Sequence, residues 1–130
     1  MKKLIPILLA MVLMTGCATP AADTPDYRQI NMQEAITMME EESDYIILDV
    51  RTPEEFIEKH IPGAINVPNE TIGSEEIPEL PDKDQLILVY CRSGNRSKQA
   101  SDKLVALGYT NIVEFGGIND WPGEVVTGAN

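Results

Sequence analysis

The stretch QLILVYCRSGNRS at residues 85–97 decides the fold, because it joins an apolar run to a helix through a short polar turn. QLILVY at 85–90 predicts a strand buried on both faces, since its apolar side chains do not alternate with polar ones. Gly94 allows a backbone turn that other residues resist. A helix is expected over 97–107, with Gly108 as its C-terminal cap. The inward residues of that helix are Ala100, Leu104 and Leu107.

Two further helices have clear starting signals upstream. Asn31 is expected to cap one, with Glu34 as its capping-box partner. The apolar residues Met32, Ile36 and Met39 would form the buried face of that helix. The second helix is expected to start at TPEE, residues 52–55, with a capping Thr, a Pro at the first helical position and a Glu at the third. It should be short, because Pro and Gly at 62–63 stop it.

Strands and helices alternate along the rest of the chain. Apolar runs predict strands at 45–50, 64–67 and 111–115. Residues 69–81 are expected to form a loop with a turn or two of helix around 74–80. Such alternation is typical of an α/β domain whose mostly parallel sheet is covered by helices on both faces. Ligands bind beyond the carboxyl ends of the strands in such sheets, so we look there for chemistry.

Cys91 directly follows the best predicted strand, between that strand and a helix start. Unpaired backbone N–H groups of the loop and the helix, together with the helix dipole, favour an anion at this point. The flanking Arg92 and Arg96 add positive charge, and such surroundings lower the pKa of a thiol. The alternative is a buried structural cysteine, which is the commonest fate of the residue. The arginines and the glycine-containing loop favour a reactive thiolate.

The N-terminus has the build of an export signal. Residues 1–16 begin with two lysines, continue with an apolar run too short to span a bilayer comfortably, and end in Thr-Gly before Cys17. This ending resembles that of bacterial lipoprotein signals, so we expect cleavage after residue 16 and lipidation of Cys17. A plain signal peptide or an uncleaved anchor is the alternative. Residues 17–26 predict a flexible tether, and residues 27–130 the folded domain.

These features also set the expected location and cysteine chemistry. The protein should be exported and anchored to a membrane by lipid, facing the periplasm or the cell exterior. A disulfide between Cys17 and Cys91, the only two cysteines, is the alternative to a lipid on one and a free thiol on the other. We expect a monomer without metal or cofactor.

The chain is acidic, with a formal net charge of −11. Without Lys2 and Lys3, eight basic residues face 21 acidic ones, so the processed chain would carry −13. Nucleic acid is excluded as an expected partner, because phosphate binding needs a basic face. Any anionic substrate must therefore be attracted by local positive charge against the overall field.

Three ordered segments resemble the motifs of rhodanese-domain sulfurtransferases. They are LDVRTPEEFIEKHIPGAINVP at 48–68, YCRSGNRS at 90–97 and GGINDWP at 116–122. The resemblance covers nearly everything from residue 27 to about 126. It implies a five-stranded sheet flanked by helices, and transfer of sulfane sulfur through a cysteine persulfide.

The resemblance also implies roles for individual residues. Cys91 would be the nucleophile, and the loop after it would cradle the persulfide. That loop consists of Arg92, Ser93, Gly94, Asn95 and Arg96. Asp49 and Arg51 match an Asp-x-Arg motif, and could form an ion pair that orients the site or is purely structural. His60 and Trp121 are expected to serve packing.

Three functions remain open at this point. The first is an enzyme that takes sulfur from thiosulfate or a similar small anionic donor and passes it to cyanide or a thiol. The second is a carrier module that exchanges a persulfide only with protein partners. The third is a phosphatase, because some dual-specificity phosphatases share the fold. Their loop is one residue longer than the four residues between Cys91 and Arg96, which disfavours that reading.

Overall fold

Five parallel strands form one sheet in the order β1-β5-β4-β2-β3 in the computed structural model, which describes residues 26–129. The strands are β1 (Arg28–Gln29), β2 (Tyr45–Asp49), β3 (Ile65–Asn66), β4 (Leu86–Cys91) and β5 (Ile112–Gly117). Every pairing between these strands is parallel, as predicted. The predicted signal at 1–16 and nearly all of the predicted tether at 17–26 lie outside the described residues.

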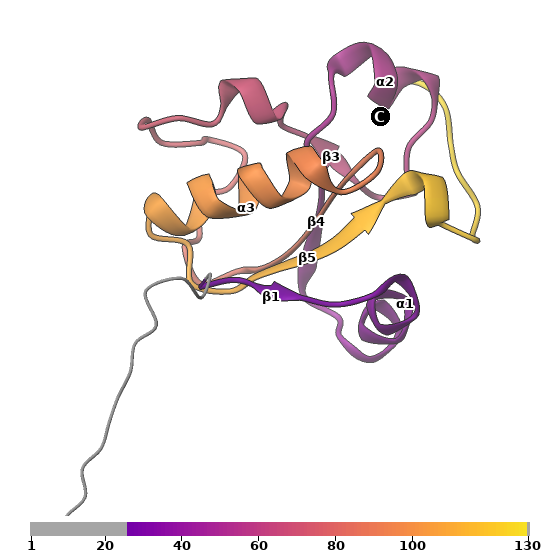
Figure 1. The fold of residues 1–130 in the computed structure, drawn as a ribbon, viewed down its shortest axis with the longest axis horizontal. Helices are drawn as coiled ribbons and strands as arrows, with labels where there is room; N and C mark the ends of the chain where they lie inside the picture. Colours follow the sequence, from indigo (N-terminus) through magenta and orange to yellow (C-terminus); the bar gives the residue numbers. More distant parts are fainter. Residues whose placement is uncertain (1–25, 130) are drawn as a thin grey trace, which may run out of the picture.

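Helices cover both faces of the sheet, which confirms the expected layers (Figure 1). They are α1 (Met32–Glu41), α2 (Pro53–Glu58) and α3 (Asn95–Ala106), with 3-10 turns at Asn69–Thr71 and Ile118–Asp120. On one face α3 and the loop before β4 bury Leu104, Leu80 and Ile72. On the other face α1 and α2 contribute Ala35 and Phe56 to a second apolar cluster.

Both predicted capping boxes are present. The side chain of Asn31 accepts from the amide of Glu34, and that of Thr52 accepts from the amide of Glu55. In turn, each glutamate carboxylate accepts from the backbone N–H of the capping residue. The buried face of α1 differs in one position from the prediction. Ala35, not Ile36, is its fully buried residue, because a small side chain lets the helix approach the sheet closely.

Three elements differ from the sequence-based expectation. Residues 74–80 contain no helix, because Pro78 interrupts the segment and the buried side chains of Ile77 and Leu80 fix a non-helical path. Helix α3 begins at Asn95, two residues earlier than expected, because Gly94 adopts a left-handed conformation with φ of 116° and ends the turn. Strand β1 was not predicted, and its two exposed residues pair with β5.

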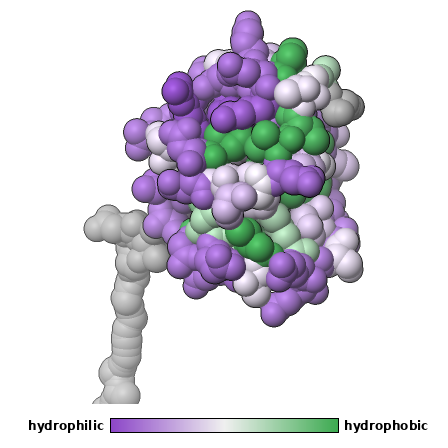
Figure 2. Space-filling model, turned by 90° about the vertical axis from the view of Figure 1, so that its right-hand side faces the viewer, coloured by the Kyte–Doolittle hydropathy of each residue, from purple (hydrophilic) through white to green (hydrophobic). Residues whose placement is uncertain are grey.

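An apolar band crosses the face on which α2 and the C-terminal segment lie (Figure 2). The large apolar side chains exposed in the described part of the chain are Ile57, Val125 and Val126. None of the helices between residues 26 and 129 has the length and apolar character needed to cross a bilayer.

Candidate active site

Cys91 is the last residue of β4, at the carboxyl end of the central strand of the sheet. Its side chain is buried, with 1% of the residue exposed, and the amide of Gly94 donates to Sγ at 3.0 Å. The chain therefore turns back on itself directly after the sulfur and enters α3. Of the N–H groups in the described loop, that of Gly94 is the one that reaches Sγ. The cysteine thus lies at a helix start, where an anion is favoured.

A buried serine and a buried glutamate extend from the sulfur into the domain. Ser97, in the first turn of α3, places Oγ 3.5 Å from Sγ of Cys91. The same hydroxyl lies 2.5 Å from Oε2 of Glu114 and 2.9 Å from the carbonyl oxygen of Gly94. Sequence reasoning assigned no role to either residue. The one signal was an acidic residue in the apolar run of β5.

Arg92 is exposed beside the buried cysteine and lines a polar cavity of about 310 Å³. Its carbonyl oxygen accepts from the amide of Asn119 at 3.1 Å, which ties the loop to the turn after β5. The other residues lining the cavity are Arg51, Glu55, Glu58, Lys59, Ile118 and Asn119. Arg92 thus lines an open cavity, and Cys91 is not among the residues that line it.

Arg96 lies in the first turn of α3, and its guanidinium forms an ion pair with Glu55 on α2. Its guanidinium donates two hydrogen bonds to the Glu55 carboxylate, at 2.8 and 3.1 Å. These bonds lower the pKa of Glu55 to about 2, so the pair stays ionised at neutral pH. Arg96 therefore holds the loop against α2, whereas Ser93 and Asn95 on either side of Gly94 are exposed.

Asp49 and Arg51 form a buried ion pair beside the strand that carries the cysteine. Nη2 of Arg51 lies 2.6 Å from Oδ2 of Asp49, and the residues are 3% and 0% exposed. Tyr90 donates to the same Oδ2 at 2.6 Å, and Arg51 also donates to the carbonyl oxygen of Lys59. Burial and the Asp49 charge raise the pKa of Tyr90 above its usual range. The pair contacts the residue before Cys91 and not the sulfur.

Gly117 packs directly against the active-site loop. A Cβ on this residue would lie 2.0 Å from the carbonyl oxygen of Arg92 and 2.6 Å from Cα of Ser93. Its φ of −142° is open to any residue, so the space and not the backbone conformation requires glycine here. Gly117, at the end of β5, thus sets how closely the loop approaches the sheet.

His60 and Trp121 have structural contacts. The His60 ring stacks on Phe56 with centroids 3.7 Å apart, and its Nδ1 lies 2.9 Å from the carbonyl oxygen of Phe56. The backbone of His60 pairs with Val126. Trp121 packs against the cluster under α1 and α2, and its Nε1 donates to the carbonyl oxygen of Glu124.

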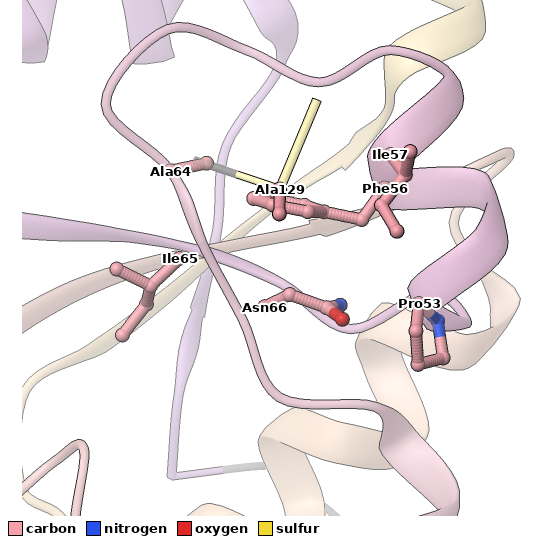
Figure 3. A pocket seen from close by; sticks show the side chains of 7 residues that line it. All are labelled: Pro53, Phe56, Ile57, Ala64, Ile65, Asn66 and Ala129. Atoms are coloured by element: carbon pink, nitrogen blue, oxygen red, sulfur yellow. The ribbon is translucent and has the colours of Figure 1, made fainter. Parts of the chain in front are cut away.

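A second cavity, of about 350 Å³, lies between α2 and the segment leading into β3 (Figure 3). Its lining is mainly apolar, with Phe56, Ile57 and Ala64 around Ala129. Cys91 is not among its lining residues, and no lining side chain titrates. Within residues 26–129, no group of His, Cys, Asp and Glu side chains is placed to hold a metal ion.

Comparison with known proteins agrees with this geometry. Residues 31–124 match the family described as rhodanese-like domain. Thiosulfate sulfurtransferase PspE of Escherichia coli (strain K12) is 38% identical over 73 residues, which are 56% of this chain and 70% of that protein. The adenylyltransferase and sulfurtransferase UBA4 of Candida albicans is 34% identical over 119 residues, and the match spans 27% of its length.

A solved structure described as a rhodanese with anions from E. coli superimposes with a TM-score of 0.59 and 36% identity. The match covers 65% of this chain and 99% of that one. The named relatives are sulfurtransferases, and the parallel five-stranded sheet is the one expected. The chain belongs to the rhodanese-like domain family.

Proposed function

We propose that the protein transfers sulfane sulfur from thiosulfate, or a similar anionic donor, to a thiophilic acceptor through a persulfide on Cys91. The observation that carries the proposal is the position of Sγ, at the end of β4 and against the amide of Gly94 at the start of α3. A thiolate or persulfide anion is favoured at such a point. The donor-type anion is supported by the relatives named thiosulfate sulfurtransferase and by the related rhodanese solved with anions.

The reaction has two steps. The Cys91 thiolate attacks the outer sulfur of thiosulfate, the S–S bond breaks, and sulfite leaves with the bonding electron pair. A thiol or cyanide then attacks the outer sulfur of the persulfide and regenerates the thiolate. This is covalent catalysis of the ping-pong kind. Cys91 is the one cysteine in the described part of the chain, so we assign the second step to an external acceptor.

A carrier role is the second candidate. The relative named adenylyltransferase and sulfurtransferase is several times longer than the region it shares with this chain, so a rhodanese-like domain there works beside another activity. The present domain would then accept and deliver sulfur only with protein partners. Rapid turnover with small donors would favour the enzyme. The rhodanese-like match and the four-residue spacing from Cys91 to Arg96 give the phosphatase alternative no support.

Intact-mass spectrometry tests the proposed function. Thiosulfate is expected to add the mass of one sulfur atom to the reduced protein, and cyanide to remove it. Cys91→Ser should remain folded, take up no sulfur and show no turnover. Sulfur on a site other than Cys91, or substantial turnover in Cys91→Ser, would refute the assignment.

Arg92→Ala is expected to weaken binding of the donor, because the exposed guanidinium next to Cys91 in sequence offsets the net negative charge of the chain. Losing one charge-assisted hydrogen bond costs about 1–3 kcal/mol, which is roughly a 5- to 150-fold fall in kcat/KM for thiosulfate. Steady-state kinetics with thiosulfate and with an uncharged sulfane donor measure the effect. The fall should be smaller for the uncharged donor, and equal losses for both would exclude anion docking by Arg92.

We also propose that residues 1–16 are removed, that Cys17 is acylated, and that the domain is exported and held at a membrane by lipid. The support is the basic start, the apolar run and the Thr-Gly-Cys sequence at 15–17. Cell fractionation with intact-mass analysis should find a membrane-bound chain beginning at a lipidated Cys17. A mature chain without lipid would contradict this proposal and leave the chemistry of Cys91 untouched.

A further inference from the structure

A buried carboxylate lies behind the Cys91 thiol, and the two-step reaction assigns it no role. Glu114, on β5, is 2% exposed. Its Oε2 accepts from the hydroxyl of Ser97 at 2.5 Å and from the amide of Gly116 at 2.9 Å. Burying an ionised carboxylate costs several kcal/mol unless a charge compensates it. Among the salt bridges of the described residues none includes Glu114, so its charge state depends on its hydrogen bonds and neighbours.

The Ser97 hydroxyl connects this carboxylate to the sulfur and has a single proton to give. When Glu114 is ionised, that proton points to Oε2, the closest acceptor, and the oxygen of Ser97 can only accept from a Cys91 thiol. When Glu114 is protonated, it donates to Ser97, and the hydroxyl proton can then be donated to the carbonyl oxygen of Gly94 at 2.9 Å or to a Cys91 thiolate at 3.5 Å. A hydrogen bond to an ionised acceptor is the stronger of the two, so the thiolate is favoured. The direction of the hydrogen-bonded chain therefore follows the position of one proton.

Two anions at the ends of this chain would destabilise each other. Cys91 is 1% exposed, so water screens its sulfur poorly from a carboxylate one hydroxyl away. Like charges in a shared buried site repel each other, and the protons of such a coupled pair come off in two steps that belong to the pair.

We propose that Cys91, Ser97 and Glu114 share one proton, so that Glu114 holds it whenever Cys91 is a thiolate or a persulfide. As the thiol ionises, the S–H proton moves to Oγ of Ser97 and the Ser97 proton moves to Oε2 of Glu114. The thiolate gains a hydroxyl donor, and the charge of the unit stays at −1. The proposal rests on Cys91 being the nucleophile. Glu114 is a positioning residue that acts through Ser97.

Other titratable groups surround Glu114 from the elements packed against β5. They are Tyr27 before β1, Glu34 on α1, Lys98 and Asp102 on α3, and Asp120 after β5. Glu34 is occupied by the cap of α1, and Lys98 and Asp102 are exposed to solvent. Solvent screens the exposed charges more than it screens the buried thiol. Tyr27 is buried with its pKa raised by that burial, so it stays neutral, and on the sulfur side the Arg96 guanidinium acts on Cys91 and favours its thiolate.

The ultraviolet absorbance of the thiolate, titrated against pH, tests the proposal. Subtracting the titration of Cys91→Ser isolates the signal of Cys91 in the full chain. The wild-type thiolate is expected to form in two separated steps, with a plateau where the unit carries one proton. Glu114→Gln keeps the shape of the side chain but cannot take the proton, so its thiolate should form in one step, complete at lower pH than in the wild type.

Asp102→Asn is the matched control, because it removes a nearby exposed charge without touching Ser97, and it should keep both steps. Thermal unfolding confirms that each variant is folded. Infrared spectroscopy of the wild type gives a reading without Glu114→Gln: a protonated carboxyl band should persist to neutral pH. Two results would overturn proton sharing. One is a single thiolate step in both the wild type and Glu114→Gln, and the other is a single thiolate step in the wild type without the protonated carboxyl band. Thiolate titration involves no sulfur donor, so it separates this result from failure of the proposed transfer.

Discussion

Gly117→Ala is expected to lower sulfur transfer by about 100-fold or more, since misplacing a reacting group by about 1 Å has effects of that size. The added methyl group would lie 2.0 Å from the carbonyl oxygen of Arg92, in a contact between two backbone segments. The contacting atoms are backbone atoms, and no flexible side chain could move aside, so the loop after Cys91 must shift. Overpacking of this kind also costs roughly 1–3 kcal/mol of folding free energy. Steady-state turnover and urea unfolding measure the two effects.

Gly73→Ala is the control for this substitution. A Cβ there would meet nothing within 4 Å, and the residue does not require a left-handed backbone. Its stability should stay within about 0.5 kcal/mol of the wild type, as for most surface substitutions, and its turnover should not change. Near wild-type turnover in Gly117→Ala would show that the loop position does not limit the reaction.

Asp49→Asn is expected to destabilise the domain by about 3–5 kcal/mol, because it leaves the Arg51 guanidinium buried without its counter-charge. Asp49 is fully buried and accepts from Arg51 and from Tyr90. For a domain of this size each kcal/mol corresponds to roughly 4–8 °C in melting temperature, so the drop should exceed about 10 °C. Thermal and denaturant unfolding provide the measurement.

Two further variants test whether the loss of stability comes from the broken buried ion pair or from the change of side chain itself. Glu79→Gln removes the same charge from an exposed position and should change stability by less than about 0.5 kcal/mol. The double variant Asp49→Asn with Arg51→Met removes both buried charges and should recover part of the loss. If the double variant is less stable than Asp49→Asn alone, the cost does not come from an uncompensated charge.

Local features of the sequence were sufficient to predict the strand, turn and helix around Cys91. The two capping boxes depend on residues three positions apart, so their signals are visible in the chain itself. The predicted start of α3 is two residues too late, because the arginines and serine around Gly94 are equally compatible with a loop. Strand β1 has two polar exposed residues, and only its pairing with β5 makes it a strand.

The contacts that complete the site are set by tertiary structure. Arg96 meets Glu55 across 41 positions of sequence, and Ser97 meets Glu114 across 17. No periodicity or spacing in the sequence predicts such contacts until the order of the strands in the sheet is known. The Asp49–Arg51 pair was expected from its resemblance to an Asp-x-Arg motif, but its hydrogen bond to Tyr90 on the neighbouring strand was not.

The edges of the sheet restrict how another protein can approach the domain. Both edge strands, β1 and β3, are two residues long, so each offers few unpaired backbone groups. Long exposed edges invite other chains to add a strand, which leads to aggregation or to peptide capture by main-chain pairing. At high concentration these domains are thus protected from pairing through the edges of their sheets. Under the proposed carrier role, a protein that exchanged sulfur with Cys91 would have to be recognised through side chains near the carboxyl ends of the strands.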